Sequence, residues 1–276
     1  MGRAILVPAM STPSIVPEPE PCVLERRRDA VAFLTLNRPA QYNALSEEML
    51  AELQARLAAL AADPSVRVVV LGGAGKAFCA GHDLKQMKAN PSLEYYQRLF
   101  DDCSRLMLQI QSLPQPVIAR VHGIATAAGC QLVAMCDLAV AADDARFAVS
   151  GINVGLFCST PSVPLSRNVG RKAAFEMLVT GEFIDAPAAV QRGLINRCVP
   201  ADRLDQEINR LAAAIVVKPP GVVAAGKALF YRQLELGVES AYRLAGQAMA
   251  CNMIDAVAQE GVGAFIEKRT PNWSPD

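Results

Sequence analysis

Apolar positions change their spacing repeatedly along the first two thirds of the chain, and this alternation predicts an α/β protein. Short β-rich runs predict strands at Val31–Leu36, Val66–Leu71 and Val117–Val121. Between them, apolar residues recur every three or four positions, which predicts amphipathic helices. These positions are Met49, Leu50, Leu53, Leu57 and Leu60 in the first helix, and Tyr96, Leu99, Phe100, Cys103, Leu106, Met107 and Ile110 in the second.

The pattern then predicts a helix at Ala128–Cys136 and short strands at Leu138–Ala142 and Phe147–Val149. Ser46 is the expected N-cap of the first helix. From Arg203 onward the strand signals stop and helical spacing continues. We therefore expect a disordered Pro-rich tail at residues 1–21, an α/β core at 22–202 and a helical region at 203–276, the last two packed as one unit.

Composition and charge exclude several classes of function. The chain has 276 residues with 27 Lys+Arg and 27 Asp+Glu, so no net charge favours nucleic acid. No run of about 18 apolar residues predicts a membrane span. Eight scattered cysteines without a C-x-x-C motif predict reduced thiols. Two histidines are too few for a His-rich metal site, and the pair Cys79 and His82 is too weak a metal signal. We expect no metal and a cytoplasmic protein.

Two stretches share a pattern that suits oxyanion chemistry. Val121–Asp137 (VHGIATAAGCQLVAMCD) and Lys76–Met87 (KAFCAGHDLKQM) each follow an apolar run, turn through small residues and open a helix. A strand that ends in such a turn aims free backbone N–H groups at one point, with the helix dipole behind them. The alternative for the first stretch, taken alone, is a tight turn and a buried small-residue helix.

Together these stretches resemble the crotonase (enoyl-CoA hydratase/isomerase) superfamily, from about Val23 to the C-terminus. Further matches are Asn37–Pro39, Asn43–Ser46, Met177–Gly181, Arg192–Ile195 and Phe265–Arg269. TAAGCQL and NVGLFCSTP look most like the enoyl-CoA hydratase domain-containing protein 3 branch. The resemblance implies a ClpP-like superhelix of ββα units. It also implies that the C-terminal helical region forms homotrimer contacts, often within hexamers, and part of the active-site wall.

The resemblance implies that an acyl-CoA thioester is bound by two backbone N–H groups, those of His82 and Ala128. Ala128 replaces the usual glycine, which keeps the N–H donor. His82 is bulkier than the usual small residue. Its imidazole either narrows the acyl pocket or acts as an acid or base, or else it only packs and its N–H alone matters.

Both glutamates that the family's hydratases use are replaced. The position of the first is Gln131, in Gly129-Cys130-Gln131-Leu132, and that of the second is Gly151, four residues after Phe147. Gln131 can hydrogen-bond a water but cannot accept its proton at neutral pH. We therefore expect weak hydration of enoyl-CoA, and a double change of Gln131 and Gly151 to Glu should raise any residual rate if the water site survives.

Other nucleophile-type residues follow in the loop Gly155–Thr160. Cys158, Ser159 and Thr160 lie where other family members place alternative catalytic groups. Each is more simply explained as a cap of the helix expected near Pro161 or as a packing residue. No His or Asp stands beside them in the sequence, so a triad is unsupported.

The resemblance also assigns the coenzyme A end. Ala80 and the segment His82-Asp83-Leu84-Lys85 match the family's coenzyme A loop, and Lys85 can reach phosphate. Phe265 and Lys268 match residues that reach the adenine and the 3′-phosphate, often from a neighbouring subunit. No cofactor is expected beyond the coenzyme A of the substrate. Two hypotheses remain: an enzyme acting on an enoyl-CoA or fatty acyl-CoA, or a silent CoA-thioester binder with a sequestering or regulatory role.

Overall fold

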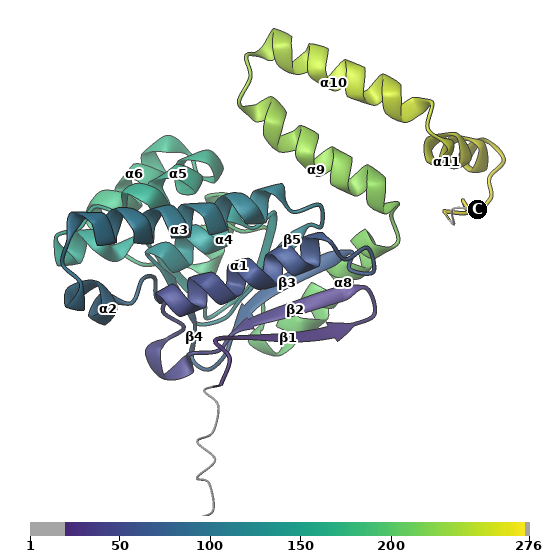
Figure 1. Cartoon of the computed structure of the whole chain (residues 1–276). Coiled ribbons are helices and arrows are strands. Elements are labelled where there is room, and N and C mark those ends of the chain that lie inside the picture. Colours follow the sequence, from purple (N-terminus) through teal and green to yellow (C-terminus); the bar gives the residue numbers. More distant parts are fainter. Residues whose placement is uncertain (1–19, 274–276) are drawn as a thin grey trace, which may run out of the picture.

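The computed structural model describes residues 20–273, and their strands form two sheets (Figure 1). The larger sheet has the strand order β1-β2-β3-β5-β7-β10. The β1–β2 pair is antiparallel and the other neighbours are parallel. Its strands are β1 (Val23–Arg28), β2 (Val31–Leu36), β3 (Val68–Gly73), β5 (Val117–Val121), β7 (Leu138–Ala142) and β10 (Arg197–Val199).

Shorter strands form the second sheet, in the order β4-β6-β8-β9. They are β4 (Ala77–Cys79), β6 (Ile124–Thr126), β8 (Arg146–Ala148) and β9 (Ile184–Asp185). Consecutive strands alternate between the sheets, because β3 leads to β4, β5 to β6 and β7 to β8. A helical segment follows each pair. The chain therefore repeats a ββα unit, and the predicted α/β class is confirmed.

The helices connect and cover these strands. They are α1 (Glu47–Ala61), α2 (Leu84–Ala89), α3 (Leu93–Ser112), α4 (Ala128–Met135), α5 (Ser159–Asn168), α6 (Arg171–Thr180), α7 (Ala186–Gln191), α8 (Leu204–Val216), α9 (Pro220–Leu234), α10 (Val238–Met253) and α11 (Ala256–Ile266), with 3-10 turns η1 (Pro39–Gln41), η2 (Ser150–Val154) and η3 (Ala201–Arg203). Ser46 is the N-cap of α1, as predicted, and its hydroxyl accepts the Met49 N–H at 3.2 Å.

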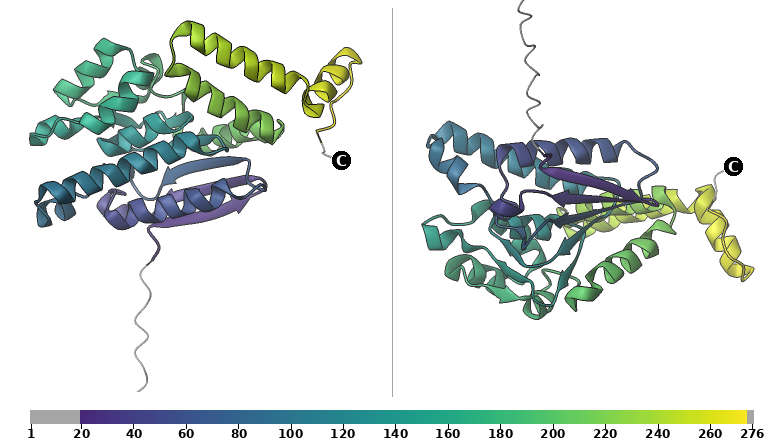
Figure 2. Two further views of the ribbon diagram at one scale, coloured as in Figure 1. Left: turned by 45° about the horizontal axis from the view of Figure 1, so that its top comes forward. Right: turned by 90° about the horizontal axis from the view of Figure 1, so that it is seen from below.

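The larger sheet is covered on both faces, which explains why β3 is apolar at successive positions. Side chains alternate across a strand, so Val69 and Leu71 point to one face and Val68 and Val70 to the other. The first pair joins the main core, which includes α1 and α3 side chains. The second pair packs with Leu204, Ile208 and Ala212 of α8. Helices α1 and α8 lie on opposite sides of the sheet (Figure 2).

Helices α9, α10 and α11 form an arm that projects from the body (Figures 1 and 2). Neither α9 nor α10 has a fully buried residue. Large apolar side chains are exposed along the arm, at Phe230, Leu234, Val238, Tyr242, Met249, Ile254, Phe265 and Ile266. An exposed apolar surface of this extent is typical of an interaction site.

No single helix within residues 20–273 is long and apolar enough to cross a membrane. One pair, 201–216 and 220–234, passes the test of length and composition when taken together, and its helices meet at 103°.

The pattern predicted several boundaries correctly, including Val31–Leu36, Val117–Val121 and Leu138–Ala142. The helix expected near Pro161 begins earlier, at Ser159, with Cys158 at its N-cap. Residues 1–19 of the predicted tail lie outside the described residues. The division between 22–202 and 203–276 stays a prediction: α8 packs on the larger sheet, whereas α9–α11 project.

Candidate active site

The first of the two loops leaves β4 and enters α2. Leu45 donates its N–H to the Gly81 carbonyl at 2.8 Å, and Asp83 donates its N–H to the Leu45 carbonyl at 3.3 Å. Successive N–H groups of an extended segment point to opposite sides. The His82 N–H therefore points away from Leu45, and it donates to no acceptor among residues 20–273.

The second loop leaves β6 and enters α4. The Ala127 N–H donates to the Ala148 carbonyl at 3.0 Å, and the Ala127 carbonyl accepts the Gln131 N–H at 3.1 Å. Ala128 is the first residue of α4, so its N–H has no partner within the helix. The Ala128 N–H also donates to no other acceptor in the described part of the chain.

The two loops touch through positions where a side chain would not fit. A Cβ on Gly81 would lie 2.9 Å from the Ala127 Cβ and 3.2 Å from the Ala128 nitrogen. A Cβ on Gly129 would lie 2.1 Å from the Cys79 carbonyl oxygen. The structure thus brings the peptide that follows Gly81 against the start of α4, and the two free N–H groups belong to one small region.

Gln131 lies one turn into α4 and is 4% exposed. Its side-chain Oε1 is buried without a hydrogen-bond partner in the described part of the molecule. Nearby on β6, Thr126 Oγ1 lies 2.7 Å from Ser150 Oγ, just before Gly151. The groups at this side of the site are therefore neutral amide and hydroxyl groups.

Gly151 lies in η2, where it is packed too tightly to carry a side chain. A Cβ there would lie 2.5 Å from the Leu156 carbonyl oxygen and 2.7 Å from Cys158 Sγ. The Gly151 N–H already donates to Cys158 Sγ at 3.3 Å. A glutamate at position 151 does not fit this loop conformation, so the loop must shift before the double change of Gln131 and Gly151 can place both carboxylates. The expected gain in rate stays a prediction.

Within residues 20–273, the hydrogen bonds of Cys158 and Ser159 include no base that would activate either side chain as a nucleophile. Burial raises the pKa of the Cys158 thiol, so the thiol is neutral near pH 7. Cys158 is the N-cap of α5, but its side chain accepts no capping hydrogen bond. Ser159 Oγ donates to the Phe157 carbonyl at 3.4 Å, a bond that is local to the turn.

The His82 imidazole lies against Phe100 of α3, with the ring centroids 5.5 Å apart in an edge-to-face arrangement. Both ring nitrogens are buried and lack a well-oriented partner within residues 20–273. Burial lowers the pKa of His82 from 6.5 to about 4, and the Leu45 backbone opposes this shift. The ring is thus neutral near pH 7, which disfavours a role as a cationic acid.

The residues matched to the coenzyme A end lie in two separate places. Ala80 is half-buried, and Asp83 caps α2 by accepting N–H groups of that helix while its Oδ2 pairs with Arg38 at 3.2 Å. Leu84 and Lys85 are exposed. Phe265, 84% exposed, and Lys268 lie at the distal end of the arm, far from α2 within one chain (Figure 1).

Ala127 is a site residue that the sequence pattern did not reveal. It has φ 50° and ψ −121°, a conformation that suits glycine and strains other residues. In the sequence, the run Ala127-Ala128-Gly129 predicts a turn of small residues but not the positive φ of Ala127. The described residues contain no group of three or more His, Cys, Asp or Glu that could hold a metal ion.

We expect Ala127→Gly to stabilise the protein, because glycine adopts this conformation without strain. After the entropy that glycine loses on folding, the net gain should be about 1 kcal/mol. Thermal unfolding should then shift upward by about 2 °C. The matched control is Ala125→Gly in β6, where the backbone is ordinary and the change should destabilise. An equal destabilisation by both changes would show that Ala127 is not strained.

The buried His82 should make the protein less stable as the pH falls. The unfolded chain takes up a proton near pH 6.5, but the folded chain does so only near pH 4. Between these values the free energy of unfolding should fall by up to about 1.4 kcal/mol per pH unit from this group. His82→Leu should flatten this slope in denaturant unfolding. An unchanged slope in His82→Leu would contradict the assignment.

The chain is similar to known proteins over most of its length. The family model for enoyl-CoA hydratase/isomerase matches residues 26–276. The chain is 46% identical over 254 residues to enoyl-CoA hydratase domain-containing protein 3, mitochondrial, of Xenopus laevis, a match that covers 92% of this chain and 86% of the relative.

Two solved structures are similar over most of their length. One is the crystal structure of enoyl-CoA hydratase from Mycobacterium smegmatis, with 66% identity, a TM-score of 0.91 and coverage of 92% of this chain and 99% of that one. The other is human enoyl-CoA hydratase domain-containing protein 3, with 44% identity, a TM-score of 0.89 and coverage of 91% and 100%. These likenesses confirm the crotonase fold, and the chain belongs to the enoyl-CoA hydratase/isomerase superfamily, in the branch of enoyl-CoA hydratase domain-containing protein 3.

Proposed function

We propose that this chain binds the thioester of an enoyl-CoA or fatty acyl-CoA through the backbone N–H groups of His82 and Ala128. One observation carries the proposal: within residues 20–273 neither N–H group donates to an acceptor, and both lie on loops that touch through Gly81 and the start of α4. A carbonyl oxygen that accepts both would gain charge there, where the N-terminus of α4 favours negative charge.

The chemistry at this oxygen is limited by the neutral groups around it. Gln131 donates or accepts hydrogen bonds but takes up no proton. Gly151 offers a peptide N–H, which Cys158 already occupies. Polarisation of the thioester and stabilisation of an enolate are therefore the steps that these residues support, and coenzyme A enters as part of the substrate without a separate cofactor.

A second candidate is a silent CoA-thioester binder with a sequestering or regulatory role. The packing at Gly151 favours it, because the loop closes where the second glutamate of a hydratase would stand. Turnover separates the two candidates, since both bind the same ligand.

We further propose that the arm joins copies of the chain into a homotrimer, or a hexamer of two trimers. The exposed apolar side chains of α9–α11 support this assembly. Phe265 and Lys268 would then meet the coenzyme A loop of a neighbouring copy. The compartment stays a prediction: composition favours the cytoplasm, whereas the name of the Xenopus laevis relative states a mitochondrial location for that protein.

We expect hydration of a short 2-enoyl-CoA to be far slower than in a typical hydratase. Each missing general acid or base removes about 10²–10⁴-fold in rate. The measurement is loss of enoyl absorbance with the purified protein. Turnover near ~10 s⁻¹ or above would overturn this expectation and reveal an unrecognised base.

The binding proposal is tested at Ala128, because proline lacks the N–H donor. Ala128→Pro should weaken acyl-CoA binding up to about tenfold more than binding of free coenzyme A, which has no thioester carbonyl. Ala128→Gly, which keeps the donor, should bind both like the unchanged protein. Paired calorimetric titrations measure this, and circular dichroism checks folding. Equal weakening of both ligands in a folded proline variant would contradict the donor assignment.

A further inference from the structure

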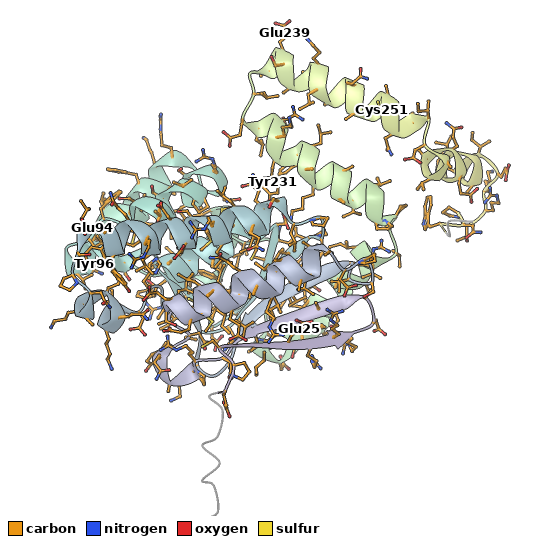
Figure 3. All side chains as sticks on the ribbon, in the orientation of Figure 1. Glu25, Glu94, Tyr96, Tyr231, Glu239 and Cys251 are labelled. Atoms are coloured by element: carbon orange, nitrogen blue, oxygen red, sulfur yellow. The ribbon has the colours of Figure 1, made fainter. Side chains whose placement is uncertain are left out.

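A buried ion pair joins the arm to the body at the end of α4 opposite to Ala128. Lys227 Nζ lies 2.6 Å from Asp137 Oδ2, and the two side chains are 7% and 12% exposed. The Tyr231 hydroxyl donates to Asp137 Oδ1 at 2.8 Å. Lys227 and Tyr231 belong to α9, and Figure 3 shows Tyr231 between that helix and the body. We call these three residues the Asp137 cluster.

Every polar group of the Asp137 cluster has a partner. Lys227 Nζ also donates to the carbonyls of Ile110 at 2.9 Å and Gln115 at 3.0 Å, which uses all three of its protons. Asp137 Oδ2 additionally accepts the Val117 N–H at 2.6 Å. A buried charge pair that is fully hydrogen-bonded fixes geometry, since any displacement leaves a buried group unpaired.

The negative charge around Lys227 Nζ explains why a cationic side chain lies between α3 and α4. Ile110 lies in the last turn of α3, and Asp137 follows Cys136, the C-cap of α4. The C-terminal ends of both helices are negative, and the Asp137 carboxylate adds to that charge. Burial lowers the pKa of the Lys227 ammonium, and the Asp137 carboxylate opposes that shift.

Helix α4 connects the Asp137 cluster to the candidate site. It has eight residues, which makes it about 12 Å long, and Ala128 through Ala134 are buried. Such a short buried helix moves as one body, because interior packing leaves no room for bending. Its N-terminal end touches the Cys79 carbonyl through Gly129, so a shift along the axis changes the position of the Ala128 N–H.

We propose that Lys227 and Tyr231 are positioning residues: by holding Asp137, they fix α4 and thereby the Ala128 N–H. The catalytic meaning of this position rests on the proposed function. The Asp137 cluster also attaches the arm to the body, together with a more exposed ion pair between Arg167 of α5 and Glu235, the C-cap of α9, at 3.5 Å. The segment proposed to contact other copies thus takes part in setting the site.

The test is amide hydrogen exchange in the full chain, without ligand, for Tyr231→Phe and Lys227→Met. Arg232→Met is the matched control, because it removes an exposed charge from the same helix. We expect exchange of the Gln131 amide, which donates to the Ala127 carbonyl in the first turn of α4, to rise about fivefold in Tyr231→Phe, as one lost hydrogen bond predicts, and more in Lys227→Met. The control should show no change. A purely local anchor would affect only the amides near Asp137 and in α9.

Unchanged exchange at Gln131 in folded Tyr231→Phe would overturn the inference, even where Lys227→Met fails to fold. Titrations of the same variants with acyl-CoA and free coenzyme A give the functional readout. The preference for acyl-CoA should fall severalfold in Tyr231→Phe, while the affinity for coenzyme A stays the same. If the unchanged protein shows no preference for acyl-CoA, the proposed function fails, but raised exchange at Gln131 would still support the positioning role.

Discussion

The backbone contact between the end of β4 and the start of α4 is the constraint on which the site depends. Gly81 and Gly129 let the two loops approach until a single Cβ would collide. Ala127 takes a strained conformation at the same contact. The strain persists because the surrounding strands of both sheets fix the ends of each loop. The free N–H groups of His82 and Ala128 are a result of this approach, and their position does not depend on any side-chain rotamer.

The groups around these N–H donors are neutral, and burial keeps them so. The pKa of His82 is lowered to about 4 and that of Cys158 is raised, both chiefly by loss of solvent. Gln131 and Gly151 carry no titratable group. The fixed charge of the site therefore comes from peptide dipoles, which act strongly where water is excluded. Such a site stabilises an oxyanion better than it moves protons.

The parts of the fold that follow from local periodicity were predictable from the sequence. β2 and β5 have the predicted boundaries, and α1 has the predicted cap at Ser46, because burial and capping leave a clear pattern over several residues. Strands β4 and β6 are three residues long, too short for a period to show. The strain at Ala127 and the crowding at Gly151 arise from contacts between distant segments. The residues next to Ala127 and Gly151 in the sequence therefore do not predict either feature.

Helix α9 of the arm both attaches to the body and carries exposed apolar side chains. Lys227 and Tyr231 of α9 both contact Asp137 of the body. Phe230 and Leu234 of the same helix remain exposed. Since the inner attachment is polar and fully hydrogen-bonded, it specifies one position of α9 rather than a range of packings. A surface that binds another copy must be held in one orientation to be recognised. The same hydrogen bonds that hold α9 also hold the end of α4. The proposed assembly and the proposed oxyanion donor Ala128 would therefore depend on one set of contacts.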